Sequence, residues 1–154
     1  MLRPLLITAC IAALPAFAQD DDENLPIAVQ AREGHMKAYA LHLGALGAMA
    51  KGEVDYDAEM ASAHASELAT LAGLAQTGYW PEGTSADEVE GSRALPAIWS
   101  DMDDFNAKKE ALHEAAMQLE SAAGESAESL QQAFGAVGGA CGACHKVYRG
   151  EENG

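Results

Sequence analysis

The sequence predicts an all-α fold, an antiparallel up-down-up-down four-helix bundle. Apolar residues recur at helical spacing in four segments of the 154-residue chain, which indicates helices that each bury one face. Alternation of apolar and polar residues, the pattern of a half-buried strand, is nearly absent. Short connections between such helices make neighbouring helices antiparallel.

The first helix is expected from Asn24 to Gly52. Asn24 is a suitable N-cap and Pro26 fits the first turn, whereas Gly52 ends the helical pattern. The apolar face of this helix is expected to consist of Met36, Ala40, Leu43 and Gly47.

The second helix is expected from about residue 57 to residue 76. It is rich in alanine, the best helix former. Its apolar positions are Met60, Leu68, Leu71 and Leu74. Glycine, proline and polar residues then predict a long loop from residue 78 to about residue 91.

The third helix is expected as one segment from residue 94 to residue 124, in which Pro96 fits only the first turn. The side chains available for its core face are Ile98, Trp99, Met102, Phe105, Leu112 and Met117. The fourth helix is expected from about residue 126 to residue 149, with Leu130, Phe134 and Val137 ahead of a cysteine motif.

Residues 1–18 have the features of a secretory signal peptide. A positive charge at Arg3 precedes an apolar run, and the run ends in the small-x-small sequence AFA at residues 16–18. The run is shorter than the roughly 20 residues that cross a bilayer, so no membrane span is expected. Acylation at Cys10 is an alternative, although it would cut the apolar run in half. We therefore predict a periplasmic protein whose mature domain spans residues 19–154.

The chain is strongly acidic, with 24 Asp and Glu against 9 Lys and Arg and a formal net charge of -15. This charge disfavours nucleic acid and anionic membranes as partners and favours basic proteins. Solubility alone is an equally good explanation of the charge. The mature segment is long enough for one compact core and hardly for two.

Cys141, Cys144 and His145 stand together in the stretch GGACGACHKVYRG. In an oxidising compartment a disulfide between the cysteines is the first interpretation. A thiol oxidoreductase would need a preceding strand, and zinc would need four ligands, whereas the sequence offers no second Cys/His cluster with suitable spacing.

C-x-x-C-H is also the attachment motif of c-type haem, in which both thiols form thioethers with the porphyrin and the histidine coordinates the iron. On a helix the three side chains occupy positions i, i+3 and i+4, so they share one face and can meet one ring inside a bundle. We therefore favour haem over the other interpretations.

The sequence resembles the class II cytochromes c, the cytochrome c prime family. The likeness covers essentially the whole mature chain, with AREGHM in the first helix, WPEGT in the loop, IWSDMDDF in the third helix and GGACGACHKVYR in the last. The resemblance implies one haem c bound covalently near the C-terminal helix through Cys141 and Cys144, with His145 as an axial ligand of its iron.

The family divides by what lies on the other side of the iron from this histidine. Its gas-binding members leave the sixth position empty behind an apolar side chain, so the iron is five-coordinate, high-spin and binds NO or CO. Low-spin relatives place a methionine there, four residues after an arginine that lies near the haem propionates. Those residues here are Arg32 and Met36. We predict Met36 as the sixth ligand, because a thioether can bond iron, with core packing as the alternative.

Other residues around the motif have weaker assignments. Arg149 is either an ordinary C-terminal helix cation or part of the haem edge, and we count it with Arg32 as haem-binding. Tyr148 is expected to pack. His35 or His42 would replace Met36 if Met36 did not bind iron. The histidines expected at the surface are His35, His42, His64 and His113.

These observations predict a periplasmic electron carrier with His/Met-ligated haem iron and redox partner proteins, basic ones being favoured. Two alternatives stay open, a five-coordinate high-spin protein that binds NO or CO and a structural bundle with a plain disulfide. No general base, nucleophile or substrate pocket can be argued from the sequence, so we do not expect an enzyme. The resemblance also allows a homodimer formed through the first two helices.

Overall fold

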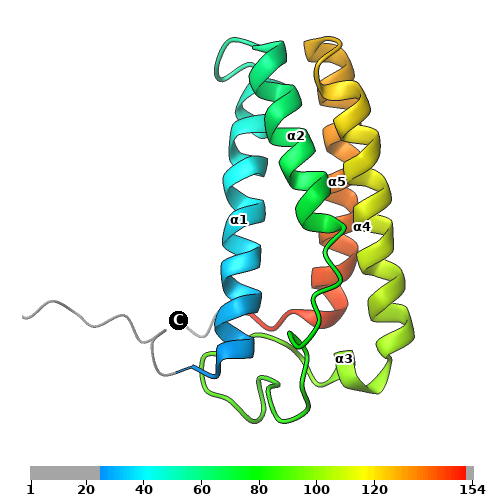
Figure 1. Cartoon of the computed structure of the whole chain (residues 1–154). Coiled ribbons are helices and arrows are strands. Elements are labelled where there is room, and N and C mark those ends of the chain that lie inside the picture. Colours follow the sequence, from blue (N-terminus) through cyan, green and yellow to red (C-terminus); the bar gives the residue numbers. More distant parts are fainter. Residues whose placement is uncertain (1–24, 152–154) are drawn as a thin grey trace, which may run out of the picture.

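The computed structural model describes residues 25–151, and helices dominate this range. They are α1 (Ile27–Ala50), α2 (Ala58–Ala72), α3 (Ala97–Ser100), α4 (Met102–Ala123) and α5 (Ala127–Tyr148). The four long helices lie side by side and alternate in direction, and the short α3 lies at one end (Figure 1). Packing of α1 on α2, α2 on α4, α4 on α5 and α5 on α1 closes the ring. The predicted antiparallel four-helix bundle is therefore confirmed.

Two sequence predictions fall outside the described residues, the signal peptide of residues 1–18 and the N-cap at Asn24. In the structure Pro26 occupies the N-cap position of α1. Within residues 25–151, no helix combines the length and the apolar character needed to cross a membrane.

The core lies between the four long helices and combines branched side chains with many alanines. The fully buried large side chains include Leu46, Leu68, Leu119, Leu130 and Val137. The buried face of α2 is mostly alanine, at positions 61, 65, 69 and 72. Small side chains at a helix contact allow a short distance between helix axes, so this face lets α2 approach α1 and α4 closely.

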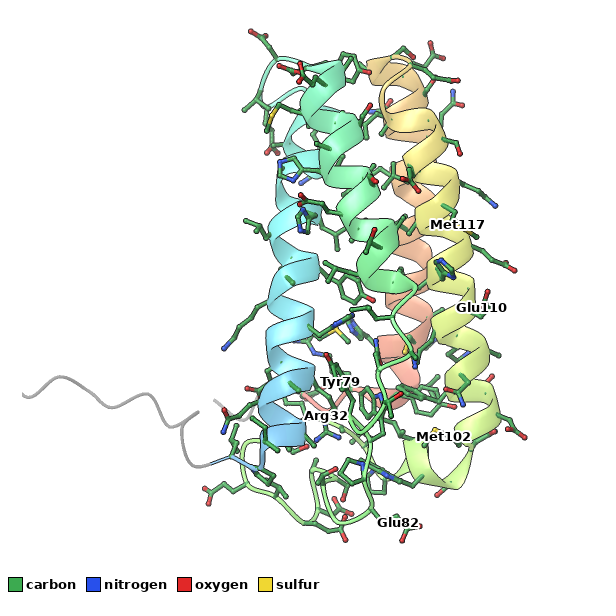
Figure 2. The ribbon with its side chains drawn as sticks, viewed as in Figure 1. Arg32, Tyr79, Glu82, Met102, Glu110 and Met117 are labelled. Atoms are coloured by element: carbon green, nitrogen blue, oxygen red, sulfur yellow. The ribbon has the colours of Figure 1, made fainter. Side chains whose placement is uncertain are left out.

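Three residues expected in the core are exposed instead. Met60, Leu74 and Met117 expose 50%, 46% and 43% of their surface. Met60 and Met117 each stand one position from a fully buried alanine, Ala61 and Ala116, and therefore lie about 100° around the helix from it. Met117 is labelled on α4 in Figure 2. Leu74 lies beyond the end of α2. In helices so rich in alanine, apolar spacing alone does not determine which face is buried.

The segment predicted as a single helix from residue 94 to residue 124 is broken at Asp101. The backbone of Asp101 has φ -141° and ψ 67°, and its carboxylate accepts a hydrogen bond from the backbone N–H of Asp104 at 3.1 Å. Asp101 is thus the N-cap of α4. The four-residue α3 is consequently a separate turn that leads the chain into the bundle.

The chain on either side of α3 fixes the end of α5. Residues 73–96 cross the open end of the bundle before α3 (Figure 1). The Leu95 N–H donates to the Tyr148 carbonyl at 3.0 Å, and the Gly150 N–H donates to the Arg93 carbonyl at 2.8 Å. These bonds hold the last turn of α5, which carries the histidine of the cysteine motif.

Candidate haem site

A cleft of about 660 Å³ lies between α1, α4 and α5 at the end of the bundle that residues 73–96 cover. All six residues singled out from the sequence line it: Arg32, Met36, Cys141, Cys144, His145 and Arg149. Its apolar lining includes Val29, Ala40, Leu43, Ile98, Phe105 and Leu112. The fold therefore brings together one site from residues more than a hundred positions apart.

The cysteine motif lies in the last two turns of α5, as predicted. Both cysteines are free thiols and half-buried, so no disulfide joins them. Burial raises the pKa of both thiols. Burial lowers the pKa of His145, and the charges of Arg149 and Arg93 lower it further. This favours the neutral imidazole, the form that binds a metal.

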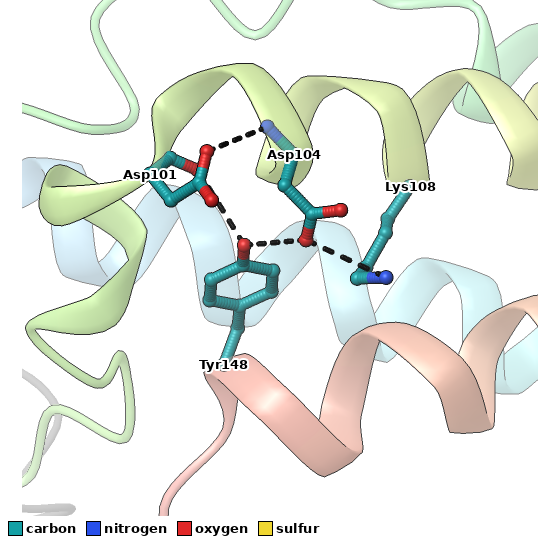
Figure 3. A network of polar contacts seen from close by, with 4 residues as sticks. All are labelled: Asp101, Asp104, Lys108 and Tyr148. Atoms are coloured by element: carbon teal, nitrogen blue, oxygen red, sulfur yellow. Dashed lines mark hydrogen bonds and ion pairs between the residues drawn. The ribbon is translucent and has the colours of Figure 1, made fainter.

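A polar network attaches the last turn of α5 to the first turn of α4 (Figure 3). The Tyr148 hydroxyl donates to Asp104 Oδ2 at 2.6 Å and to the Asp101 carbonyl at 3.4 Å. Lys108 Nζ lies 3.4 Å from the same Asp104 oxygen. The hydrogen bond raises the pKa of Tyr148 to about 12 and lowers that of Asp104. The sequence predicts only a packing role for Tyr148, because its polar partners are 44 and 47 residues away along the chain.

The packing role of Tyr148 is also present. Its ring is buried and meets Phe105 edge to face, with ring centroids 5.3 Å apart. Phe105 in turn meets Trp80 edge to face at 4.7 Å. Together with the polar network, these contacts fix the direction in which the adjacent turn presents His145 to the cleft.

Arg32 is buried at the covered end of α1 (Figure 2) and holds the loop in place. Its guanidinium donates to the Thr84 carbonyl at 2.9 Å, to Thr84 Oγ1 at 3.2 Å and to Ser92 Oγ at 3.5 Å. It also lies 4.8 Å from the ring centroid of Trp80. The predicted position of Arg32 beside the haem site is consistent with this geometry. Its contacts with residues 73–96 do not follow from the sequence.

Met36 faces the cleft together with Ala40 and Leu43, and 40% of its surface is exposed. This part of the expected apolar face of α1 therefore lines the cleft and is not the face packed between helices. The residues of α1 buried in the bundle include instead Val29, Arg32, His35, Tyr39, His42 and Leu46. A helix in a bundle with a cleft has two apolar faces, and the spacing pattern does not tell them apart.

His35 and His42 were expected at the surface but are buried, with 6% and 7% exposure. The His35 ring packs edge to face on Tyr39 at 4.6 Å and lies 3.4 Å from the Gln76 amide nitrogen. Burial lowers the pKa of His35. Neither histidine lines the cleft, whereas Met36 does. Within α1, Met36 is therefore better placed than either histidine to approach a group bound there.

The residues present fit a haem c. A volume of about 660 Å³ lies within the range of cofactor sites, roughly 300–1,000 Å³. The walls are largely apolar, as a porphyrin requires, and two thiols and an imidazole stand on one helical face within the cleft. Arg32, Arg93 and Arg149 supply positive charge at the edge, where haem carboxylates would be matched.

Comparison with known proteins agrees with this chemistry. A family model described as cytochrome C' matches residues 27–149. The chain belongs to the cytochrome c prime family. As a member of this family it carries a covalently attached haem c with its iron.

Individual relatives match over most of their length. The cytochrome c' of Cereibacter sphaeroides is 46% identical over 148 residues, which cover 96% of this chain and 98% of the relative. The structure of a cytochrome c' from Rhodobacter sphaeroides has a TM-score of 0.80 and 46% identity, covering 86% of this chain and 100% of that one. A nitric oxide complex of a cytochrome c prime variant from Alcaligenes xylosoxidans has a TM-score of 0.69 and 34% identity, covering 80% and 94%.

Proposed function

We propose that this protein is a periplasmic haem protein that binds a small diatomic gas such as NO or CO. In this proposal Cys141 and Cys144 hold the haem, and His145 coordinates the iron from α5. The observation that carries the proposal is the cleft, which joins this motif to a largely apolar wall from α1 and α4. The relative solved as a nitric oxide complex supports the choice of ligand.

The side chains of this chain would have separate tasks. When bound, the haem iron supplies a one-electron redox couple and a coordination position for the gas. Leu43, Phe105 and Leu112 give the cleft an apolar wall, which favours an uncharged ligand over ions. The Tyr148–Asp104 contact holds the turn that presents His145.

A second candidate function is the electron carrier predicted from the sequence, with Met36 as the sixth ligand. The observation that favours it is the position of Met36, whose side chain lines the same cleft as His145 instead of packing between helices. Met/His ligation is a known arrangement for electron transfer and raises the reduction potential. Both candidates use the same haem, so one residue separates them.

Replacing Met36 by leucine tests the choice. Leucine nearly conserves the volume of methionine, so the free energy of unfolding should change by less than about 1.5 kcal/mol. If gas binding is the function, the wild-type haem is already five-coordinate and high-spin and binds CO readily, and Met36→Leu leaves the spin state unchanged. The measurement is the absorption and magnetic circular dichroism spectrum of both oxidation states, with and without CO.

The control is Met49→Leu, because Met49 stands on the same helix but is buried in the bundle core, outside the cleft. It should leave the haem spectrum unchanged. A low-spin wild type that becomes high-spin only in Met36→Leu would reject the gas-binding proposal and establish the electron carrier. A low-spin wild type that neither variant changes would reject both candidate functions.

The periplasmic location rests on residues 1–18. N-terminal sequencing of the protein recovered from a periplasmic fraction should begin at Gln19. Recovery of an uncleaved chain with the cytoplasm would contradict this part of the proposal.

A further inference from the structure

A second cluster of metal-ligand side chains lies outside the haem cleft, where α1 packs on α2. His42 on α1 and His64 and Glu67 on α2 each offer one ligand atom, and these atoms all lie within 4.8 Å of one another. The Nδ1 atoms of His42 and His64 are 3.0 Å apart. His42 Nδ1 lies 3.3 Å from Glu67 Oε2. None of the three residues lines the haem cleft.

The separations of 3.0 and 3.3 Å from His42 are close to the edges of a zinc coordination shell. Zinc binds histidine nitrogen and carboxylate oxygen at roughly 2.0–2.2 Å, so two ligands at a tetrahedral angle lie about 3.3 Å apart. His64 and Glu67 are three residues apart on α2 and therefore share a face. His42 lies opposite that face on α1, and its Nδ1 atom is the one that lies close to both His64 and Glu67.

Burial of the three groups is graded, as an accessible metal site requires. The His42 side chain is 9% exposed, His64 is half-buried, and the Glu67 side chain is 66% exposed. An ion can therefore enter from the side of Glu67, and that carboxylate is free to adjust by rotation. The net charge of -15 raises the local concentration of cations at the surface.

We propose that His42, His64 and Glu67 bind a zinc ion, with water completing the coordination. Three protein ligands and a water make an open tetrahedral site, and imidazole with carboxylate suits zinc among the divalent metals. The ion would join α1 to α2. His42 is six residues from Met36, about 9 Å along α1, so this site is separate from the haem iron.

Zinc titration of the untagged, chelator-treated holoprotein by calorimetry tests the proposal. We expect one zinc per chain and a melting temperature that rises with zinc, because the ligand set exists only in the folded state. His64→Gln should weaken binding at least about 10–100-fold, since loss of even an outer-shell partner has that effect. Glu67→Gln should also weaken it. X-ray absorption at the zinc edge should show two imidazole ligands.

The matched control is His113→Gln. His113 Nδ1 lies 3.8 Å from Glu110 Oε1 three residues away on α4, so it is a histidine–carboxylate pair that belongs to no three-ligand cluster of the described residues. This variant should bind zinc like the wild type. Since His42 is buried, its replacement would test folding as well as binding, and the assay therefore relies on His64 and Glu67.

Three results would overturn the proposal. They are the absence of saturable zinc binding, equal affinity in His64→Gln and the wild type, and equal losses in His64→Gln and His113→Gln. In each case the pair of histidines is only a hydrogen-bonded contact between helices.

Discussion

Replacing Arg32 by alanine should detach residues 73–96 from α1. The guanidinium makes two hydrogen bonds of 3.2 Å or less to Thr84 and lies 4.8 Å from the Trp80 ring centroid. Burial lowers the pKa of Arg32, but arginine stays protonated at any pH at which the protein is folded. The loop is therefore held by charge-assisted bonds to a buried cation.

The size of the effect follows from these contacts. Loss of a hydrogen bond to a charged group costs about 1.5–3 kcal/mol, and a partly buried cation–π contact contributes about 0.5–2 kcal/mol. Taking the lower ends, two bonds and one ring contact give a decrease of about 3.5 kcal/mol in the free energy of unfolding. Arg32→Lys keeps the charge but not the planar fork, so its effect should be intermediate.

The assay combines urea denaturation of the holoprotein with hydrogen exchange of the loop amides. The Ala86 N–H, which donates to the Ala94 carbonyl at 2.7 Å, should exchange faster in Arg32→Ala. Lys51→Ala is the control, because Lys51 is exposed and lies 3.7 Å from Glu53, a surface pair worth at most about 1 kcal/mol.

A loss below about 1 kcal/mol with unchanged loop exchange would refute this reasoning and show that apolar packing holds the loop. Unchanged stability with a shifted reduction potential would instead place the main role of Arg32 at the haem carboxylates, as the family resemblance implies.

Three further predictions concern the haem motif, its support and the charged surface. Cys141→Ser with Cys144→Ser should abolish the haem that survives acid–acetone extraction and lower helicity, and normal folding of this variant without haem would contradict the assignment. Tyr148→Phe should destabilise the protein most between about pH 5 and 9. The contribution of Asp104, whose pKa is lowered, is present above about pH 4 and is lost as pH falls through its folded value. That of Tyr148, whose pKa is raised to about 12, is present below about pH 10 and is lost as pH rises through 12. Denaturation curves across pH should therefore converge for the two proteins at both extremes, and a constant difference down to about pH 2 would count against the hydrogen bond. If a basic redox partner is steered by the net charge of -15, the electron-transfer rate should fall steeply between about 0.01 and 0.15 M salt, and a flat rate would leave solubility as the role of the charge.

The sequence by itself determined the features whose causes are local. Helical spacing and capping residues predicted the four long helices, and α5 runs from Ala127 to Tyr148 within one residue of its prediction. The haem-attachment motif consists of Cys141, Cys144 and His145, which lie within five consecutive residues. It can therefore be recognised in the sequence without knowledge of the fold. The break at Asp101 also has a local cause, the capping bond between its carboxylate and the backbone N–H of Asp104. This bond competes with a continuous helix. Helix propensity alone favoured the continuous helix, which was wrong.

Only the tertiary structure decided which side chains meet across helices. Arg32 reaches Thr84 across 52 residues, and His42 meets His64 across 22. Sequence spacing showed no second cluster of metal ligands, because a ligand set divided between two helices depends on the register in which they pack. The buried face of α2 is mostly alanine, which leaves no pattern of large side chains in the sequence from which the opposing residue could be inferred.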